Sequence, residues 1–211
     1  MNKATILALS TLVGRVMGLV TAPIDGYDVF TPEWEVELSP GGRTVTLNGT
    51  IEEVYQQVVQ LNPNYEQQSS TVTTSSSQKQ SSTPSKVAQN ASVMLAVDWN
   101  LATSLCGGKW QATSVRRVRE GIGYLRRVRG RPSSLAGPSR CGRVSCAYNS
   151  AIWWCNDDLQ PKALSSFAAI ADGAQFLVKR CVEWMNPQPE AFGGQAFHPS
   201  GWNVIIRKDE C

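Results

Sequence analysis

The chain has 211 residues, of which 42% are hydrophobic and 18% are charged, and its formal net charge is +3. The low charge fraction and the ordinary apolar content exclude a wholly disordered chain and a protein with several membrane spans. A single histidine argues against a His-rich zinc site. The charge is uneven, since residues 1–97 carry five basic and eight acidic side chains (−3), whereas residues 98–211 carry fifteen and nine (+6).

The first 22 residues have the layout of a secretory signal peptide. A positively charged start is followed by an uncharged, mostly apolar run over 4–14, and small residues then allow cleavage after Gly18 or Ala22. Arg15 keeps the apolar run below the roughly 20 residues that a membrane-spanning helix needs. An amphipathic N-terminal helix is the alternative. We therefore expect a secreted, extracellular protein that is not transmembrane.

Residues 26–66 predict a β-hairpin followed by a helix. Residues 34–38 and 43–47 alternate apolar with polar side chains around a turn rich in Gly and Pro. Thr50 and Glu53 then form a capping box for a helix that stops before Asn62-Pro63. Because a segment of about 40 residues is too small to be stable alone, we expect it to pack on the later domain or to serve as a pro-segment.

Residues 67–92 are rich in Ser, Thr and Gln and hold too few apolar side chains to offset the entropy of ordering. This composition predicts a flexible linker that is open to O-glycosylation. Two sequons, at Asn48 and Asn90, are candidate N-glycosylation sites of an exported chain.

The predicted domain over 93–211 contains all six cysteines. An even number confined to one part of an exported chain predicts three disulfides, although sequence alone does not choose among the pairings. A metal site is the alternative, but no CxxC pair occurs and the spacing lacks a zinc-ligand pattern. We therefore expect neither a metal nor a cofactor. The disulfide candidates are Cys106, Cys141, Cys146, Cys155, Cys181 and Cys211.

The apolar patterns within 93–211 predict an α+β fold. Helices are indicated by apolar side chains at three- and four-residue steps, and strands by alternating or continuous apolar runs. The order predicts a two-layer α/β sandwich, with two packed helices on one face of a small, mostly antiparallel sheet. The expected elements are a helix over 114–129 that Gly130 and Pro132 end, strands over 143–148 and 151–155, a helix from Ser165 or Ser166 to Cys181, and a strand over 202–207.

Several short motifs of this region occur together. They are Cys141-Gly142-Arg143-Val144-Ser145-Cys146, Ala151-Ile152-Trp153-Trp154-Cys155-Asn156-Asp157, Gly193-Gly194-Gln195 and Trp202-Asn203-Val204-Ile205-Ile206 before Cys211. With the helix that ends in Cys181, they resemble the small secreted cysteine-rich proteins of filamentous ascomycete fungi, in particular the Ecp2-type necrosis-inducing effectors and, more remotely, the KP4 killer toxin. The hairpin over 34–50 resembles a segment found ahead of such domains.

The resemblance covers about half of the chain, and the Ser/Thr-rich linker and the Arg-rich helix depart from it. It implies a compact, disulfide-stapled α/β sandwich that is secreted and acts on a host or competitor cell. It carries over no catalytic residue.

Residues 116–131 contain seven arginines and one acid, Glu120, so their charge is +7 − 1 = +6. Guanidinium groups bind phosphates, acidic polysaccharides and anionic lipids through paired hydrogen bonds. The alternative is a solvated helix face whose Arg stems cover apolar surface. Docking of the acidic N-terminal segment on this helix is a further possibility. The candidate patch, for which an anionic surface or polysaccharide is the expected partner and nucleic acid is not, is Arg116, Arg117, Arg119, Arg126, Arg127, Arg129 and Arg131.

A catalytic site would have to use His198, together with a Ser and with Asp157, Asp158 or Asp172. No GxSxG motif accompanies it, so we interpret His198 as a loop residue without a catalytic role. Asp157 and Asp158 could form a glycosidase pair, but adjacent residues in a turn rarely face one pocket.

Trp153 and Trp154 could offer a surface for sugar rings. They point to opposite sides of a strand, however, so burial of both in the core is the main interpretation. The resemblance implies an effector- or toxin-like protein, and the residues favour action by binding, with no catalytic residues. A secreted carbohydrate-binding module or a small hydrolytic enzyme is the alternative.

Overall fold

The computed structural model describes residues 20–68 and 98–211. The predicted signal peptide and the predicted linker therefore fall largely outside the described residues, as does the sequon at Asn90. Within the described ranges, no helix is long and apolar enough to cross a membrane.

A six-stranded sheet forms the centre of the molecule, and its strands are ordered β1-β7-β8-β12-β11-β4. Only β1 and β7 run parallel, and the other neighbours are antiparallel, as predicted. The strands are β1 (Asp28–Phe30), β4 (Thr103–Cys106), β7 (Arg140–Ala147), β8 (Ser150–Asn156), β11 (Gly194–His198) and β12 (Trp202–Lys208).

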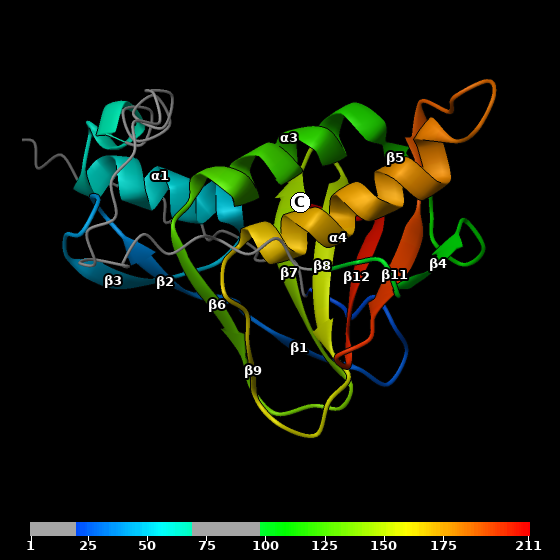
Figure 1. Cartoon of the computed structure of the whole chain (residues 1–211), viewed down its shortest axis with the longest axis horizontal. Coiled ribbons are helices and arrows are strands. Elements are labelled where there is room, and N and C mark those ends of the chain that lie inside the picture. The colour runs from blue at the N-terminus through cyan, green and yellow to red at the C-terminus, as the bar shows by residue number, and fades with distance from the viewer. Residues whose placement is uncertain (1–19, 69–97) are drawn as a thin grey trace, which may run out of the picture.

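Two helices cover one face of this sheet: α3 (Val115–Arg127) and α4 (Ala168–Val178), which continues as a π-helix, η1 (Lys179–Glu183). Figure 1 shows α3 and α4 side by side across β7, β8, β12 and β11. A short ladder of β5 (Thr113–Ser114) and β10 (Ala191–Phe192) lies at the start of α3. The predicted α+β fold with helices on one face of a mostly antiparallel sheet is confirmed.

A second sheet joins the N-terminal segment to the cysteine-rich part. Its strands are ordered β3 (Thr44–Asn48), β2 (Glu33–Glu37), β6 (Gly130–Ser134) and β9 (Lys162–Ala163). The predicted hairpin is β2–β3, and the predicted helix is α1 (Ile51–Leu61), where Glu53 Oε2 accepts the Thr50 N–H at 2.8 Å. Because β2 pairs with β6 and β1 with β7, the N-terminal segment is part of both sheets: it contributes β1 to the large sheet and β2 and β3 to the second sheet.

The main core lies between the large sheet and the helices. Trp34 of β2 is fully buried there against Phe167, with ring centroids 4.5 Å apart, and its Nε1 donates to the Gly49 carbonyl at 2.7 Å. Trp154 faces this core, whereas Trp153 faces a smaller cluster on the opposite side of the sheet. Both side chains are completely buried, so their interpretation as core residues is correct and neither offers a surface to sugars.

All six cysteines pair in three disulfides, as predicted. Cys106–Cys181 links edge strand β4 to η1, and Cys141–Cys155 links β7 to β8. Cys146–Cys211 fastens the C-terminal residue to the end of β7. Every bridge lies within residues 106–211, so none reaches the N-terminal segment.

Two predicted helix boundaries are wrong. The helix expected to reach residue 129 ends at Arg127, because the chain turns at Val128 into β6. At Gly130, where φ is 138°, a Cβ atom would collide with the Glu35 carbonyl, so only glycine lets β6 approach β2 this closely. The second helix begins at Ala168 and is capped by Phe167 instead of Ser165 or Ser166.

Candidate functional site

The seven arginines of the predicted patch do not form one helix face. Five lie on α3, but Arg129 follows its end and Arg131 lies on β6, opposite Glu35 of β2. Those on α3 also differ in their surroundings. The Arg126 guanidinium binds Asp172 Oδ1 of α4 at 2.7 Å, and Arg127 donates to the Gly123 carbonyl and covers the Tyr124 ring. These two side chains support helix packing, which leaves the first turn of α3 as the part of the patch that can bind a partner.

Ion pairs at the start of α3 lie at the protein surface, although the Arg117 side chain is partly buried. Arg116 Nε and Arg117 Nη1 bind the two oxygens of Glu120 at 3.1 and 2.8 Å. The hydrogen bond from Arg117, assisted by that from Arg116, holds the pKa of Glu120 below its usual range. Arg119 binds Glu183 Oε1 of η1 at 3.3 Å. Ion pairs at the protein surface add little to stability, so an incoming anion can replace the carboxylates at little cost.

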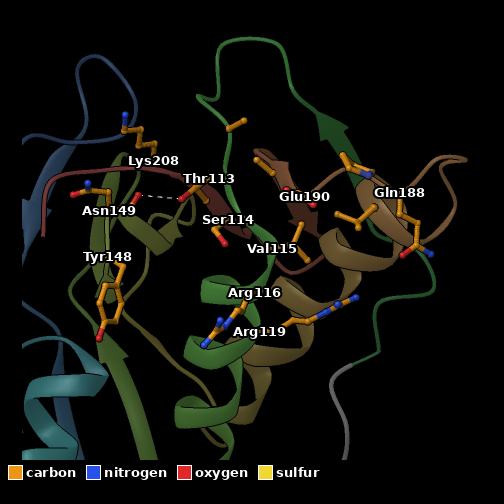
Figure 2. A pocket seen from close by; sticks show the side chains of 14 residues that line it. Thr113, Ser114, Val115, Arg116, Arg119, Tyr148, Asn149, Gln188, Glu190 and Lys208 are labelled. Atoms are coloured by element: carbon orange, nitrogen blue, oxygen red, sulfur yellow. Dashed lines mark hydrogen bonds between the residues drawn. The ribbon is translucent and has the colours of Figure 1, made fainter.

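A groove of about 820 Å³ lies beside this turn. Figure 2 shows Tyr148 and Asn149 on one side of it, Gln188 and Glu190 on the other, and Arg116 and Arg119 between them. The walls come from the start of α3, the turn between β7 and β8, the 188–191 segment and the end of β12. The groove therefore forms only when segments far apart in the sequence come together.

The groove has a positive lining. Arg116, Arg119 and Lys208 contribute three cations, against one carboxylate from Glu190. The Arg116 side chain is 78% exposed and that of Arg119 is 49% exposed, so both remain accessible in spite of their ion pairs. A concave surface lined by one sign of charge concentrates ligands of the opposite sign. The expected ligand is an anion.

Tyr148 is the most unusual residue of the groove. It has a φ of 51° and Asn149 a φ of 59°, so the two form the tight turn of the β7–β8 hairpin with both residues in the left-handed region. Asn tolerates this conformation, but a bulky aromatic residue adopts it at a cost. Tyr148 is nevertheless 73% exposed, and the Arg117 guanidinium carbon lies 3.7 Å from its ring centroid.

This side of the groove is firmly held. Cys146, two residues before Tyr148, is bound to Cys211. The Thr113 hydroxyl contacts the Asn149 carbonyl at 3.0 Å and the Ser150 hydroxyl at 2.6 Å. The Lys208 N–H donates to the Gln111 carbonyl at 2.9 Å, which fixes the end of β12 against the same region. The binding surface is thus formed in advance.

His198, the only histidine, lies at the end of β11 and forms no triad with the candidate aspartates. Its Nδ1 is 2.8 Å from the Ser200 hydroxyl, and its Nε2 is 3.1 Å from the Asp98 carbonyl. The ring stacks on Trp202 and meets Trp99 edge-on. Burial lowers the pKa of His198, which favours the neutral imidazole. The predicted loop position of His198 is wrong, since the residue ends strand β11, where its Nε2 fastens residue 98 to this strand.

Asp157 and Asp158 also bind different partners. Asp157 accepts hydrogen bonds from Tyr27 and from Asn203 Nδ2, whereas Asp158 binds Lys162 Nζ at 3.3 Å. Hydrogen bonds from the Gln160 N–H and from Lys162 lower the pKa of Asp158. The two carboxylates are therefore not arranged as a pair across a shared site.

A polar chain on the large sheet was missed by the sequence analysis. Gln195 Nε2 donates to Asn203 Oδ1 at 3.1 Å, and Asn203 in turn donates to Asp157, which also binds Tyr27. Burial, and then the Asp157 charge, raise the pKa of Tyr27. The signal in the sequence was Asn203, the single polar residue among the apolar residues 202–206 of β12. Gln195 and Asn203 are buried. Through Tyr27, these hydrogen bonds join the N-terminal segment to the large sheet.

The described residues also bear on a metal site and on the sequon at Asn48. No group of three or more His, Cys, Asp or Glu side chains in 20–68 and 98–211 could hold a metal ion. Asn48, the described sequon, is exposed at the end of β3, and Thr50 of the same sequon caps α1.

The comparisons with known proteins give no relative: no family model, no curated protein and no solved structure matches the chain. The resemblance to fungal effectors and killer toxins therefore stays a prediction.

Proposed function

We propose that the protein is a secreted, effector- or toxin-like binding protein whose groove beside α3 binds an anionic partner on a host or competitor cell. One observation carries this proposal. Arg116 and Arg119 of α3 and Lys208 of β12 line a single preformed groove. Of the seven arginines in the predicted patch, Arg116 and Arg119 are the two that line it.

The three disulfides support secretion. Such bridges form and persist in oxidising compartments and are rare in the cytosol. All six cysteines are paired within 106–211, and Cys146–Cys211 braces the wall of the groove that carries Tyr148. A protein that works outside the cell can therefore keep this groove in shape. The action on a host or competitor cell rests on the resemblance to fungal effectors and killer toxins.

The proposal is tested by removing the groove cations and no others. The triple variant Arg116→Gln, Arg119→Gln, Lys208→Gln should elute from immobilised heparin at lower salt than the wild type, with a weaker dependence of affinity on salt, because fewer counterions are exchanged. The control is Arg43→Gln, Arg131→Gln, Lys179→Gln, which removes the same charge outside the groove. Equal shifts for the two triple variants would show that only net charge matters, and would overturn the proposal.

The biological readout uses the same variants. Purified oxidised protein should cause cell death in infiltrated plant tissue or inhibit the growth of a competitor fungus, and the groove variant should lose this effect while the control keeps it. An equally active groove variant would separate the effect from the groove and contradict the proposed role.

A further inference from the structure

We infer that the groove takes an acidic saccharide, a sugar chain that carries carboxylate or sulfate groups, with one sugar ring stacked on Tyr148. This inference rests on the proposed function and narrows its partner to one chemical class.

The first argument is the Tyr148 ring. Arg117 covers one face of the ring at 3.7 Å, and the residue is 73% exposed, so the other face is available. A flat aromatic face suits the apolar C–H face of a sugar ring. Tyr148 keeps this position although its φ of 51° would be better served by Asn or Gly. An unfavourable backbone conformation that presents a side chain to solvent is typical of a functional residue.

The second argument is the set of polar groups around that ring. Asn149, Gln188 and Glu190 offer amide and carboxylate groups, which donate to and accept from sugar hydroxyls. Arg116, Arg119 and Lys208 offer cations for acidic substituents. A neutral sugar has no acidic group that could replace Glu120 on Arg116 or Glu183 on Arg119, or that could pair with Lys208. A free phosphate or sulfate would leave the aromatic ring and the amides unused.

The third argument is shape. The groove is an open depression of about 820 Å³ between the segments that carry Tyr148 and Gln188. A flat anionic membrane could reach the exposed Arg116, but it would not fill the space between Tyr148 and Gln188. A flexible chain can enter the groove and place a ring and an acidic group at the same time. The observations therefore favour a saccharide chain over a lipid surface.

The experiment is calorimetric titration of the oxidised full-length protein with defined probes. These are an oligogalacturonate and a heparin hexasaccharide as acidic sugars, cellohexaose as a neutral sugar, inorganic phosphate, and vesicles that contain phosphatidylserine. We expect saturable binding of an acidic sugar and much weaker binding of cellohexaose and phosphate.

Variants of Tyr148 separate stacking from charge. Tyr148→Asn should weaken binding of the acidic sugar about tenfold, since it removes the ring while suiting the left-handed turn. Tyr148→Phe should bind like the wild type. The matched control is Trp184→Ala. Trp184 resembles Tyr148 because it is 69% exposed and has an arginine, Arg180, over its ring, but it lies outside the groove lining. Trp184→Ala should leave the affinity unchanged.

The outcomes distinguish this inference from the proposed function. Binding of vesicles or phosphate that depends on the groove cations but not on Tyr148 would overturn the saccharide and leave the anion-binding groove intact. Equal loss for Tyr148→Asn and Trp184→Ala would also overturn the saccharide. Binding of any anion that is insensitive to the groove cations would overturn both.

Discussion

The two described parts of the chain differ in net charge and in their disulfides. Residues 20–68 carry one basic and eight acidic side chains (−7) and no cysteine, whereas residues 98–211 carry fifteen basic and nine acidic side chains (+6) and three disulfides. Opposite charges would suggest that ion pairs join the two parts. One long ion pair does, between Asp28 and Arg140 at 3.8 Å, but the buried contacts are apolar, such as Trp34 against Phe167.

The arginines of α3 illustrate this difference. Arg116, Arg119 and Arg126 bind Glu120, Glu183 and Asp172, which all belong to the cysteine-rich part. Helix α1 packs on α3 through aromatic side chains. Opposite net charge therefore adds a long-range attraction, while packing decides where the N-terminal segment lies.

Removal of Trp34 should have the largest effect on this contact. Trp34→Ala deletes a fully buried ring and its hydrogen bond to the Gly49 carbonyl, so we expect the free energy of unfolding to fall by about 3–5 kcal/mol. Urea denaturation of the oxidised protein measures the loss. Glu35→Ala, at an exposed position of the same strand, is the control and should change stability by less than about 0.5 kcal/mol. A similar small change for Trp34→Ala would contradict the packing argument.

The hairpin and helix that surround Trp34 show what the sequence could predict. The alternation in β2 and β3 and the Thr50–Glu53 capping box are local signals, and the structure follows them. Strands β1, β4 and β6 are short and have no such pattern, since their partners lie far away in the chain. β6 contains a proline, Pro132, which normally argues against a strand.

The groove could be predicted only in part. The excess of arginine at the start of α3 pointed to an anion. Nothing local indicated that the turn at Tyr148 would lie beside it, because that position depends on the pairing of β7 with β8 and on Cys146–Cys211. The number of disulfides followed from the even cysteine count, but their pairing follows from which strands become neighbours.

Glu52 makes a charged contact between the two parts, and its removal should have a moderate effect. Its carboxylate accepts hydrogen bonds from the Ser145 hydroxyl at 2.6 Å and from the Cys146 N–H at 3.1 Å, where the β7–β8 register is interrupted between Arg143 and Ser145. Hydrogen bonds to a charged group contribute about 1.5–3 kcal/mol.

Glu52→Gln keeps the shape of the side chain but loses the charge, and we expect a loss of about 1–2 kcal/mol. Hydrogen exchange of the Cys146 amide should become faster at the same time. Glu33→Gln, at an exposed position of β2, is the matched control. Unchanged protection of the Cys146 amide in Glu52→Gln would show that the carboxylate does not secure this contact.

Replacement of His198 should have the smallest effect. It should change only how the free energy of unfolding depends on pH. The folded protein keeps the pKa of His198 below its ordinary value of 6.5, chiefly because the ring is partly buried, and Lys162 adds to the shift while Asp98 opposes it. As the pH falls through 6.5, the unfolded chain therefore binds the proton before the folded protein does. The free energy of unfolding should fall with pH until the folded pKa is passed, and then level off.

The physical cause lies in the contacts of the ring. Neutral Nδ1 accepts the Ser200 N–H at 3.2 Å, and a protonated ring could not. His198→Gln should remove this part of the pH dependence between about pH 5 and about pH 8, where histidine is the side chain that ordinarily titrates. Because the chain has one histidine, no other imidazole can supply the same slope. Parallel stability profiles for the wild type and His198→Gln would mean that Trp99 and Trp202 alone hold residue 98 against β11.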